Sequence, residues 1–315
     1  MAVSNGKNAQ SCRLCGANGQ LIDLGILPNS FYFAGAKTTE VLLGGRLQAC
    51  GHCGSSQRSE IYSEDFYNQL YRLGKGDAWS DQTDRKDNGK ITRFIADHSQ
   101  IKTVLDVGCG VGDLLNALPI HIIRFGIEPS EEAKTIAKTQ NIEVLGDTIA
   151  SLRSTDKFDC ITSVDVIEHI VEPNSFIKKL FQHVKPGGVL IISTGNPQAV
   201  AWRKFLKASF WYSSFPEHLS FPSQKHYAEL AQQLGAERVA FESFRYFDGR
   251  LMKKFAQAFL QFSYALSPAL HRVLLKFIFY KFMGLRGGFE RDFFLPCAGL
   301  FHDHHICFLY KADKN

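Results

Sequence analysis

The sequence lacks the long apolar run that a membrane-spanning helix requires. Its best candidate, residues 255–270, falls short of the ~18 residues needed and is interrupted by glutamines, serines and Pro268. The first ten residues are polar and lack the apolar core of a secretory signal, so we expect a cytoplasmic location. Fixed-period repeats and low-complexity tracts are also absent, which argues against a solenoid or a disordered chain.

A strong excess of one charge is missing as well. The chain has 36 Lys and Arg against 31 Asp and Glu, a net charge of +5. Nucleic-acid binding usually requires a concentrated basic surface, so this modest excess does not favour a nucleic acid as partner. Hydrophobic residues make up 45% of the chain and charged residues 21%, as in globular proteins. A length of 315 residues therefore predicts one elaborated α/β domain with a small accessory module.

Cysteine is scarce, with eight residues, but its spacing is informative. Two C-x-x-C-G units begin at Cys12 and Cys50, and each predicts a tight knuckle in which two thiolates converge. Four thiolates in a tetrahedral array bind Zn²⁺ and leave no open position for chemistry, so the predicted zinc ion is structural. A redox role or unrelated thiols are the alternatives. The predicted ligands, in a module over residues 1–60, are Cys12, Cys15, Cys50 and Cys53.

After a predicted helical linker or cap over residues 61–100, strand and helix patterns alternate. The predicted strands are residues 103–107, 122–127, 142–145, 158–164, 189–193, 238–247 and 304–310. The predicted helices are residues 113–117, 130–139, 174–183 and 223–234. This alternation predicts a Rossmann-like α/β fold over residues 101–315: a seven-stranded, mostly parallel sheet with helices on both faces. A helical insertion over residues 250–300 precedes the last strand.

The firmest motif is the glycine-rich turn Val104–Gly112, in which an apolar strand runs directly into Gly108, Gly110 and Gly112 before a helix opens at Asp113. Glycines let the backbone approach a ligand closely, and the carboxyl end of the first strand is where nucleotide-like ligands bind in such folds. The spacing is G-x-G-x-G rather than the dinucleotide G-x-G-x-x-G, and Asp113 disfavours a pyrophosphate. A positively charged ligand without phosphate is favoured instead.

S-adenosylmethionine is such a ligand. Its sulfonium and ammonium groups suit Asp106 at the end of the first strand, and a carboxylate at Glu128, at the end of the second, can accept hydrogen bonds from both ribose hydroxyls. At these residues the sequence resembles the class I S-adenosylmethionine-dependent methyltransferases, from about residue 100 to residue 195. The resemblance implies cofactor contacts at Gly108, Gly110, Glu128 and Asp147. The full set of predicted cofactor-binding residues is Asp106, Gly108, Gly110, Gly112, Glu128, Asp147 and Asp165.

The knuckles, the catalytic domain and the segment Leu21–Pro28 also resemble the deoxysugar C-methyltransferases, which carry an N-terminal zinc module. The resemblance does not extend to the C-terminal lobe of those enzymes. It implies methylation of a small biosynthetic acceptor, such as a sugar or a glycan or lipid-linked intermediate, at oxygen or carbon. The alternatives are an RNA or protein methyltransferase that uses the zinc module for recognition, and a non-catalytic partner that only binds the cofactor.

Two Glu-His pairs supply the candidate catalytic groups. Glu168-His169 follows the fourth predicted strand, and Glu217-His218 follows the fifth, so both should approach the methyl group at the carboxyl edge of the sheet. Histidine can take a proton from an acceptor near neutral pH, so His218 or His169 is the expected base, with Glu217 beside it. The alternatives are structural histidines, or a second metal site of Glu168, His169 and His218.

Residues 250–288 contain no Asp or Glu but intersperse Lys and Arg with phenylalanines. This pattern suits amphipathic helices at an anionic membrane surface, so a peripheral contact with the inner membrane is one prediction. A helical cap over the active site or a dimer interface would present the same apolar face. The sequence gives no oligomeric state.

Overall fold

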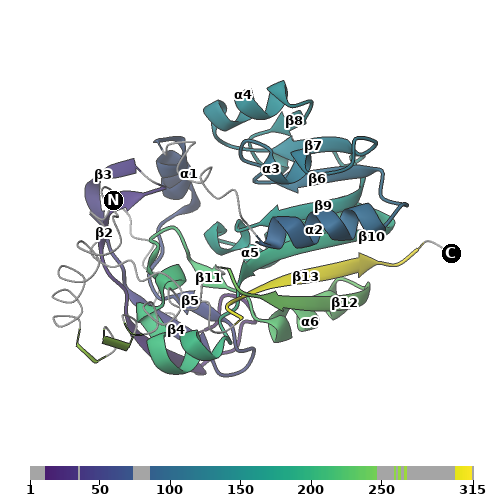
Figure 1. Cartoon of the computed structure of the whole chain (residues 1–315). Coiled ribbons are helices and arrows are strands. Elements are labelled where there is room, and N and C mark those ends of the chain that lie inside the picture. The colour runs from purple at the N-terminus through teal and green to yellow at the C-terminus, as the bar shows by residue number, and fades with distance from the viewer. Residues whose placement is uncertain are drawn as a thin grey trace.

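The computed structural model describes residues 11–34, 36–73, 86–246 and 302–313, together with the single positions 259, 262, 263, 266 and 267. Within these ranges, the chain forms one large sheet, a smaller N-terminal sheet and a short hairpin (Figure 1). No helix in the described ranges has the length and apolarity to cross a bilayer. The predicted insertion over residues 250–300, and with it the predicted membrane contact, lies almost wholly outside the described residues.

The large sheet has the seven strands that the sequence predicts. All neighbouring strands are parallel except around the last strand of the chain, which pairs antiparallel with both of its neighbours. In spatial order the strands are β12 (Ala236–Phe244), β13 (His304–Lys311), β10 (Val184–Gly195), β9 (Phe158–Val164), β6 (Thr103–Val107), β7 (Ile123–Ile127) and β8 (Glu143–Gly146). The predicted Rossmann-like sheet is confirmed, although β10 is longer than expected.

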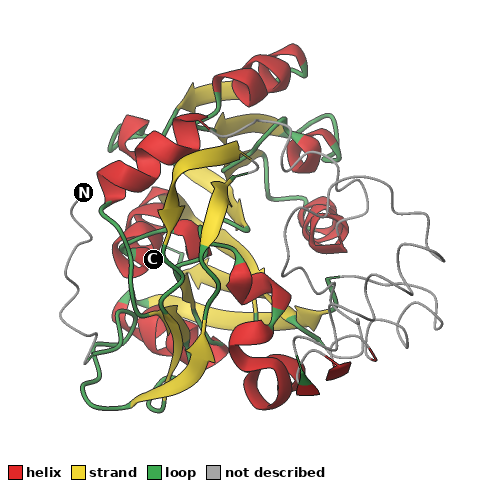
Figure 2. Ribbon diagram, turned by 90° about the vertical axis from the view of Figure 1, so that its left-hand side faces the viewer, coloured by secondary structure: helices red, strands yellow, loops and turns green. Residues whose placement is uncertain are grey.

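Helices cover both faces of this sheet, as Figure 2 shows. Their apolar residues form two separate cores, one with Leu180 and Leu230 against the sheet and one with Ile91 and Leu115 against its other face. The helices of the first core are α5 (Pro173–His183) and α6 (Gln224–Gln233). Those of the second are α2 (Lys86–Asp97), α3 (Asp113–Asn116) and α4 (Glu131–Thr139).

Capping serines and a first-turn proline mark where three of the helices begin. Ser130 and Ser223 cap α4 and α6, because each serine hydroxyl accepts a hydrogen bond from a first-turn backbone N–H, and Pro173 occupies the first turn of α5. Helices α4 and α5 thus begin just after β7 and β9, at the edge of the large sheet that carries the glycine turn, whereas α6 begins just after β11 (Ser220–Phe221) of the smaller sheet.

The N-terminal module is a sheet of β1 (Leu21–Ile26), β4 (Arg46–Cys50) and β5 (Ser56–Arg58), with a hairpin of β2 (Ser30–Phe33) and β3 (Ala36–Leu42). Its fourth strand, β11 (Ser220–Phe221), comes from the part of the chain that forms the large sheet and its helices, and pairs antiparallel with β5. The predicted boundary near residue 60 falls between β5 and α1 (Glu64–Leu73). Main-chain hydrogen bonds therefore join the module to the larger domain (Figure 1).

Short helical turns at Ala201–Leu206, Lys207–Ser209 and Trp211–Ser214 link β10 to β11. Trp202 and Phe210 are fully buried there, with ring centroids 4.7 Å apart, and pack with Leu47 of the module. Trp202 and Phe210 thus belong to the hydrophobic core between the two parts of the chain.

Candidate functional site

The three glycines of the turn have different structural roles. Each has a positive φ, +79° at Gly108, +53° at Gly110 and +96° at Gly112. A Cβ at Gly112 would lie 2.2 Å from Ile142 Cδ1, and one at Gly108 would lie 2.5 Å from Val166 Cγ2. A Cβ at Gly110 would meet no atom within 4 Å, and Gly110 borders the cavity. Gly110 is therefore the point at which a ligand can reach the backbone.

A cavity of about 780 Å³ opens at the carboxyl ends of the parallel strands, beside this turn. It is large enough for a cofactor together with a small acceptor. Most of the predicted site residues line it: Asp106, Gly108, Gly110, Glu128, Asp147, Asp165, His169 and His218. Gly112 and Glu217 are not among the lining residues.

Glu128 is held in place by the turn itself. Its carboxylate accepts hydrogen bonds from the backbone N–H of Gly110, at 2.9 Å, and from that of Ser130, at 2.8 Å. Burial raises the pKa of Glu128 above its usual range, while these two hydrogen bonds act in the opposite direction. The side chain is thus a fixed hydrogen-bond acceptor at the cavity wall.

Three aspartates complete the carboxylate wall. Asp106 is buried and accepts a hydrogen bond from the Thr162 hydroxyl at 2.6 Å. Asp147 lies at the rim, where Lys134 pairs with its carboxylate. Asp165 has a left-handed backbone, with φ +51°, and accepts a hydrogen bond from the Tyr212 hydroxyl at 3.0 Å. The wall that these residues form is acidic, which suits a positively charged ligand.

The two predicted catalytic histidines lie side by side, with ring centroids 4.8 Å apart. His218 Nδ1 is 2.6 Å from the Tyr212 carbonyl oxygen, and His169 Nδ1 is 3.1 Å from the Glu217 carbonyl oxygen. A carbonyl oxygen only accepts, so His218 carries its proton on Nδ1 and its lone pair on Nε2. Burial lowers the pKa of His169 to about 4 and that of His218 well below its usual range.

Glu217 occupies a different environment from its neighbour His218. Its side chain is buried and is one of the acidic groups that act on Arg58. Burial lowers the pKa of Arg58 to about 10, and the nearby Tyr67 and Glu217 partly oppose this shift. Glu217 lies in a turn that a hydrogen bond from the His218 N–H to the Phe215 carbonyl closes, and of the two side chains only that of His218 lines the cavity.

The sequence does not single out Arg58, although it is the largest fully buried charged side chain in the described ranges. It is fully buried at the end of β5 and donates hydrogen bonds to four backbone carbonyls. The accepting oxygens belong to Gly44, Ser213, Phe215 and His218. Its own backbone N–H donates to Leu219, at 2.8 Å. Arg58 thus fixes the position of the segment that carries His218.

Residues of the module and of α1 also form one wall of the cavity. These are Ala34, Glu64, Tyr67, Asn68 and Tyr71. The Tyr71 hydroxyl is 2.8 Å from His169 Nδ1, so α1 contacts the histidine pair directly. The amphipathic pattern of α1 predicts a helix but does not reveal which surface it covers.

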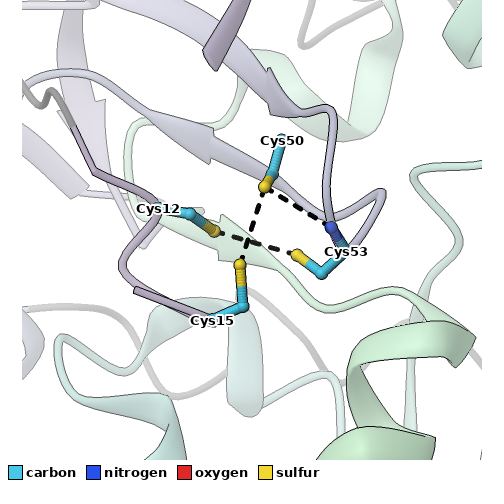
Figure 3. Close-up of side chains that lie close together, drawn as sticks. All are labelled: Cys12, Cys15, Cys50 and Cys53. Atoms are coloured by element: carbon cyan, nitrogen blue, oxygen red, sulfur yellow. Dashed lines mark hydrogen bonds between the residues drawn. The ribbon is translucent and has the colours of Figure 1, made fainter. Parts of the chain in front are cut away.

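The four knuckle cysteines converge as predicted (Figure 3). The Sγ atoms of Cys12 and Cys53 are 3.8 Å apart, and those of Cys15 and Cys50 are 3.6 Å apart. Zn–S bonds near 2.3 Å place tetrahedral sulfurs roughly 3.8 Å apart, so the cluster fits Zn²⁺. Gly16 and Gly54 close the two turns with positive φ. Ser223, the cap of α6, donates to the Cys53 carbonyl, which ties the knuckle to the larger domain.

Comparison with known proteins gives relatives over the central part of the chain. A ubiquinone biosynthesis O-methyltransferase of Rickettsia akari is 37% identical over 116 residues, which are 34% of this chain and 45% of the relative. One of Salmonella enteritidis is 33% identical over 110 residues, 32% of this chain and 46% of the relative. The chain thus spans about half the length of the curated relatives it matches.

Among solved structures, the N-methyltransferase NodS of Bradyrhizobium japonicum has a TM-score of 0.47 and 13% identity, over 78% of this chain and 97% of that one. A methyltransferase of Thermotoga maritima, possibly acting on histamine, has a TM-score of 0.43 and 17% identity, over 71% and 90%. The family profile described as "Methyltransferase domain" matches residues 81–240, about half of the chain. This protein therefore belongs to the methyltransferase domain family.

Proposed function

We propose that this enzyme methylates a hydroxyl oxygen of a small, ring-containing acceptor. The observation that carries the proposal is that the lining of the cavity has two different parts. One half is acidic and borders the glycine turn, whereas the other is aromatic and contains the histidine pair. A donor and an acceptor bound in these halves would meet inside one enclosed space, as an in-line transfer requires.

The acidic half fits S-adenosylmethionine. Glu128, held by two backbone N–H groups, is suited to accept hydrogen bonds from the ribose hydroxyls, and Asp106 offers a carboxylate to the cationic amino-acid end. Asp147 at the rim is the candidate for the adenine amino group, and Asp165 lies between the two halves. Open space above Gly110 leaves room for the cofactor. When bound, the cofactor supplies an electrophilic methyl group on a sulfonium that leaves as a neutral thioether.

The aromatic half fits a planar or ring-shaped acceptor, because aromatic side chains stack on rings and exclude water. Its aromatic lining comes from α1 and from the segments before β11 and after β12, and consists of Tyr67, Tyr71, Tyr212, Phe215 and Tyr246. The relatives named ubiquinone biosynthesis O-methyltransferases support oxygen as the methylated atom. A sugar acceptor has no comparable support.

A hydroxyl must lose its proton as it is methylated, and His218 is the group placed to assist. The Tyr212 carbonyl holds the proton on Nδ1, which leaves the Nε2 lone pair for the acceptor hydroxyl. His218 Nε2 would take the proton of the acceptor hydroxyl, so that the electron pair of the broken O–H bond would stay on the oxygen that forms the bond to the methyl carbon. His169 packs against His218 and helps to position it.

We further propose that Cys12, Cys15, Cys50 and Cys53 hold a structural Zn²⁺ ion, supported by their sulfur separations and by their closed, mostly buried shell. The zinc-stabilised module then contributes the wall of the acceptor half. Through Arg58 and the β5–β11 pairing, it also fixes the segment that carries His218.

Methyl-labelled S-adenosylmethionine tests the proposal. The enzyme is incubated with hydroxylated ring compounds, nucleotide sugars, RNA or protein, and each pool is assayed for label. We expect label in the hydroxylated ring compounds and a large loss of methyl transfer in His218→Ala. The control His121→Ala removes an exposed histidine elsewhere in the chain and should show no loss. Label confined to sugars, RNA or protein, or undiminished turnover in His218→Ala, would contradict the proposal.

A further inference from the structure

The Tyr212 hydroxyl lies within hydrogen-bond distance of two carboxyl groups, those of Asp165 and Glu168. Asp165 and Glu168 both follow β9, whereas Tyr212 lies 44 positions beyond Glu168, so the fold brings the three side chains together. A phenol has one proton and can donate it to only one of the two carboxyl groups. A second proton is therefore needed between them. The mechanism proposed above gives Glu168 no role.

The second proton belongs on Glu168 rather than on Asp165. Glu168 is fully buried, whereas Asp165 is half-buried and borders the cavity. An ionised carboxylate is more costly in the interior than beside a cavity, so the neutral form is favoured at Glu168. Burial first, and then the charge of Asp165, raise the pKa of Glu168 above its usual range.

The surroundings of Glu168 do not offset this cost. Among the residues that the structure describes, no Lys or Arg forms an ion pair with it. The titratable groups around it are Tyr71 of α1, Asp165 and His169 after β9, Tyr212 and His218 before β11, and Tyr227 of α6. Burial raises the pKa of the tyrosines and lowers the pKa of the histidines, so these side chains are neutral near pH 7. Asp165 is the charged group among them, and its charge is negative.

A proton on Glu168 gives these groups one consistent order of hydrogen bonds. Glu168 Oε1 donates to Tyr212 Oη, and Tyr212 Oη donates to Asp165 Oδ1 at 3.0 Å. The second oxygen of Glu168 accepts a hydrogen bond from the Thr194 hydroxyl, also at 3.0 Å. Both oxygens of Glu168 then have a defined role, and the buried side chain carries no charge.

Tyr212 in turn contacts His218 through its ring and through its main chain. The two ring centroids are 4.3 Å apart, and the Tyr212 carbonyl oxygen is 2.6 Å from His218 Nδ1. On the other side of the histidine, the Leu219 N–H donates to the carbonyl oxygen of Glu168 at 2.7 Å. Glu168 is thus connected to the residues that fix the position and the tautomer of His218.

We propose that Glu168 is a positioning residue that carries a proton, donates it to the Tyr212 hydroxyl and thereby keeps His218 Nε2 directed at the acceptor. Glu168 is not among the residues that line the cavity, so it acts through Tyr212 rather than on the acceptor itself. This inference rests on the proposed function, in which His218 Nε2 takes the proton of the acceptor hydroxyl.

Infrared spectroscopy detects the proton on Glu168 without any measurement of activity. The C=O stretch of a protonated carboxyl group is separate from the bands of a carboxylate, and the difference spectrum between the wild type and Glu168→Gln isolates this side chain. At pH 7 we expect a protonated carboxyl band in the wild type that is absent from Glu168→Gln. The control Glu143→Gln changes an exposed glutamate on β8 and should keep the band.

Methyl transfer to a hydroxylated ring compound tests the positioning role. The amide of Glu168→Gln can still donate to Tyr212, so turnover should stay within about threefold of the wild type. Glu168→Met keeps the size of the side chain without a donor, and kcat should fall about tenfold or more as His218 is displaced. Affinity for S-adenosylhomocysteine should not change. Combining Glu168→Met with Tyr212→Phe should cost no more than the slower single variant, because both remove the same hydrogen bond.

If Glu168→Met does not fold, as judged by circular dichroism, Tyr212→Phe takes its place, because it breaks the same hydrogen bond at the other end. The absence of the protonated carboxyl band from the wild type would overturn the inference. Wild-type turnover in folded Glu168→Met, or an equal loss in Glu168→Gln, would overturn the positioning role and leave the proposed function standing. If the wild type methylates no hydroxyl compound, the proposed function fails and the positioning role with it, whereas the infrared band still decides where the proton lies.

Discussion

Arg58 allows the link between the N-terminal module and the catalytic segment to be tested by one substitution. Arg58→Met keeps most of the side-chain volume and removes all the hydrogen-bond donors of the guanidinium group. Three of the carbonyls concerned, those of Ser213, Phe215 and His218, lie in the segment that carries the candidate catalytic histidine, at 3.4, 2.8 and 3.3 Å from the guanidinium. The substitution therefore loosens this segment without touching the cofactor half of the cavity.

The magnitude follows from these contacts. A buried carbonyl left without a donor costs about 1–3 kcal/mol, and relief from burying the guanidinium charge offsets part of the total. We expect Arg58→Met to lower the free energy of unfolding by about 2–4 kcal/mol. Displacement of a catalytic group by about 1 Å can cost about 100-fold in rate, so turnover should fall on that order. Arg58→Lys keeps a charge but loses the planar fork and should be intermediate.

The assay combines urea unfolding, methyl-transfer rates and calorimetry with S-adenosylhomocysteine. We expect turnover and stability to fall while affinity for S-adenosylhomocysteine stays near that of the wild type. Arg46→Met is the matched control, because Arg46 lies on the neighbouring strand β4 in an exposed pair with Asp23, and exposed ion pairs contribute little to stability. Wild-type turnover in folded Arg58→Met would refute the claim that the module positions His218.

Four further substitutions test other parts of the account. Cys15→Ser should abolish stoichiometric zinc and lower the melting temperature by roughly 10 °C, as loss of a structural metal does, whereas an unchanged zinc content would contradict the four-cysteine site. Burial alone would raise the pKa of Asp159, but hydrogen bonds, from Lys185 among others, hold it below its usual range. The stabilisation from Asp159 is therefore present above the unfolded-state pKa of about 3.9 and is lost as pH falls through the lower folded-state value. Asp159→Asn should be less stable than the wild type by about 1–3 kcal/mol at pH 7, and urea unfolding curves that fail to converge at low pH would refute this. Gly110→Ala should weaken S-adenosylhomocysteine binding as measured by calorimetry. Gly112→Ala should instead lower the free energy of unfolding in urea by about 1–3 kcal/mol, because its Cβ meets Ile142. The reverse pattern would contradict the roles assigned to the two glycines.

The large sheet and the cofactor half could be predicted because they depend on short-range patterns. Strand and helix periods alternate over residues 103–193, and this alternation fixes a parallel sheet whose carboxyl edge gathers Asp106, Glu128 and Asp165. The knuckle cysteines were predictable for the same reason, since each pair is separated by two residues and closed by a glycine.

The acceptor half was only partly predictable because it depends on contacts between distant segments. No local pattern indicates that β11 adds to the module sheet, that Arg58 reaches the segment before it, or that Tyr71 of α1 contacts His169. Glu217 was predicted as a catalytic residue because it precedes His218 in the sequence. Its side chain is instead buried near Arg58 and does not line the cavity. The role of residues 250–288 stays a prediction.

The most direct test of the central claim is calorimetry with S-adenosylhomocysteine on the wild type, Glu128→Ala and His218→Asn. A donor half built on the glycine turn predicts one binding site per chain, at least tenfold weaker binding in Glu128→Ala, equivalent to about 1.4 kcal/mol, and unchanged binding in His218→Asn. Wild-type affinity in a folded Glu128→Ala variant would contradict the assignment of the cavity beside Gly110 as the cofactor site.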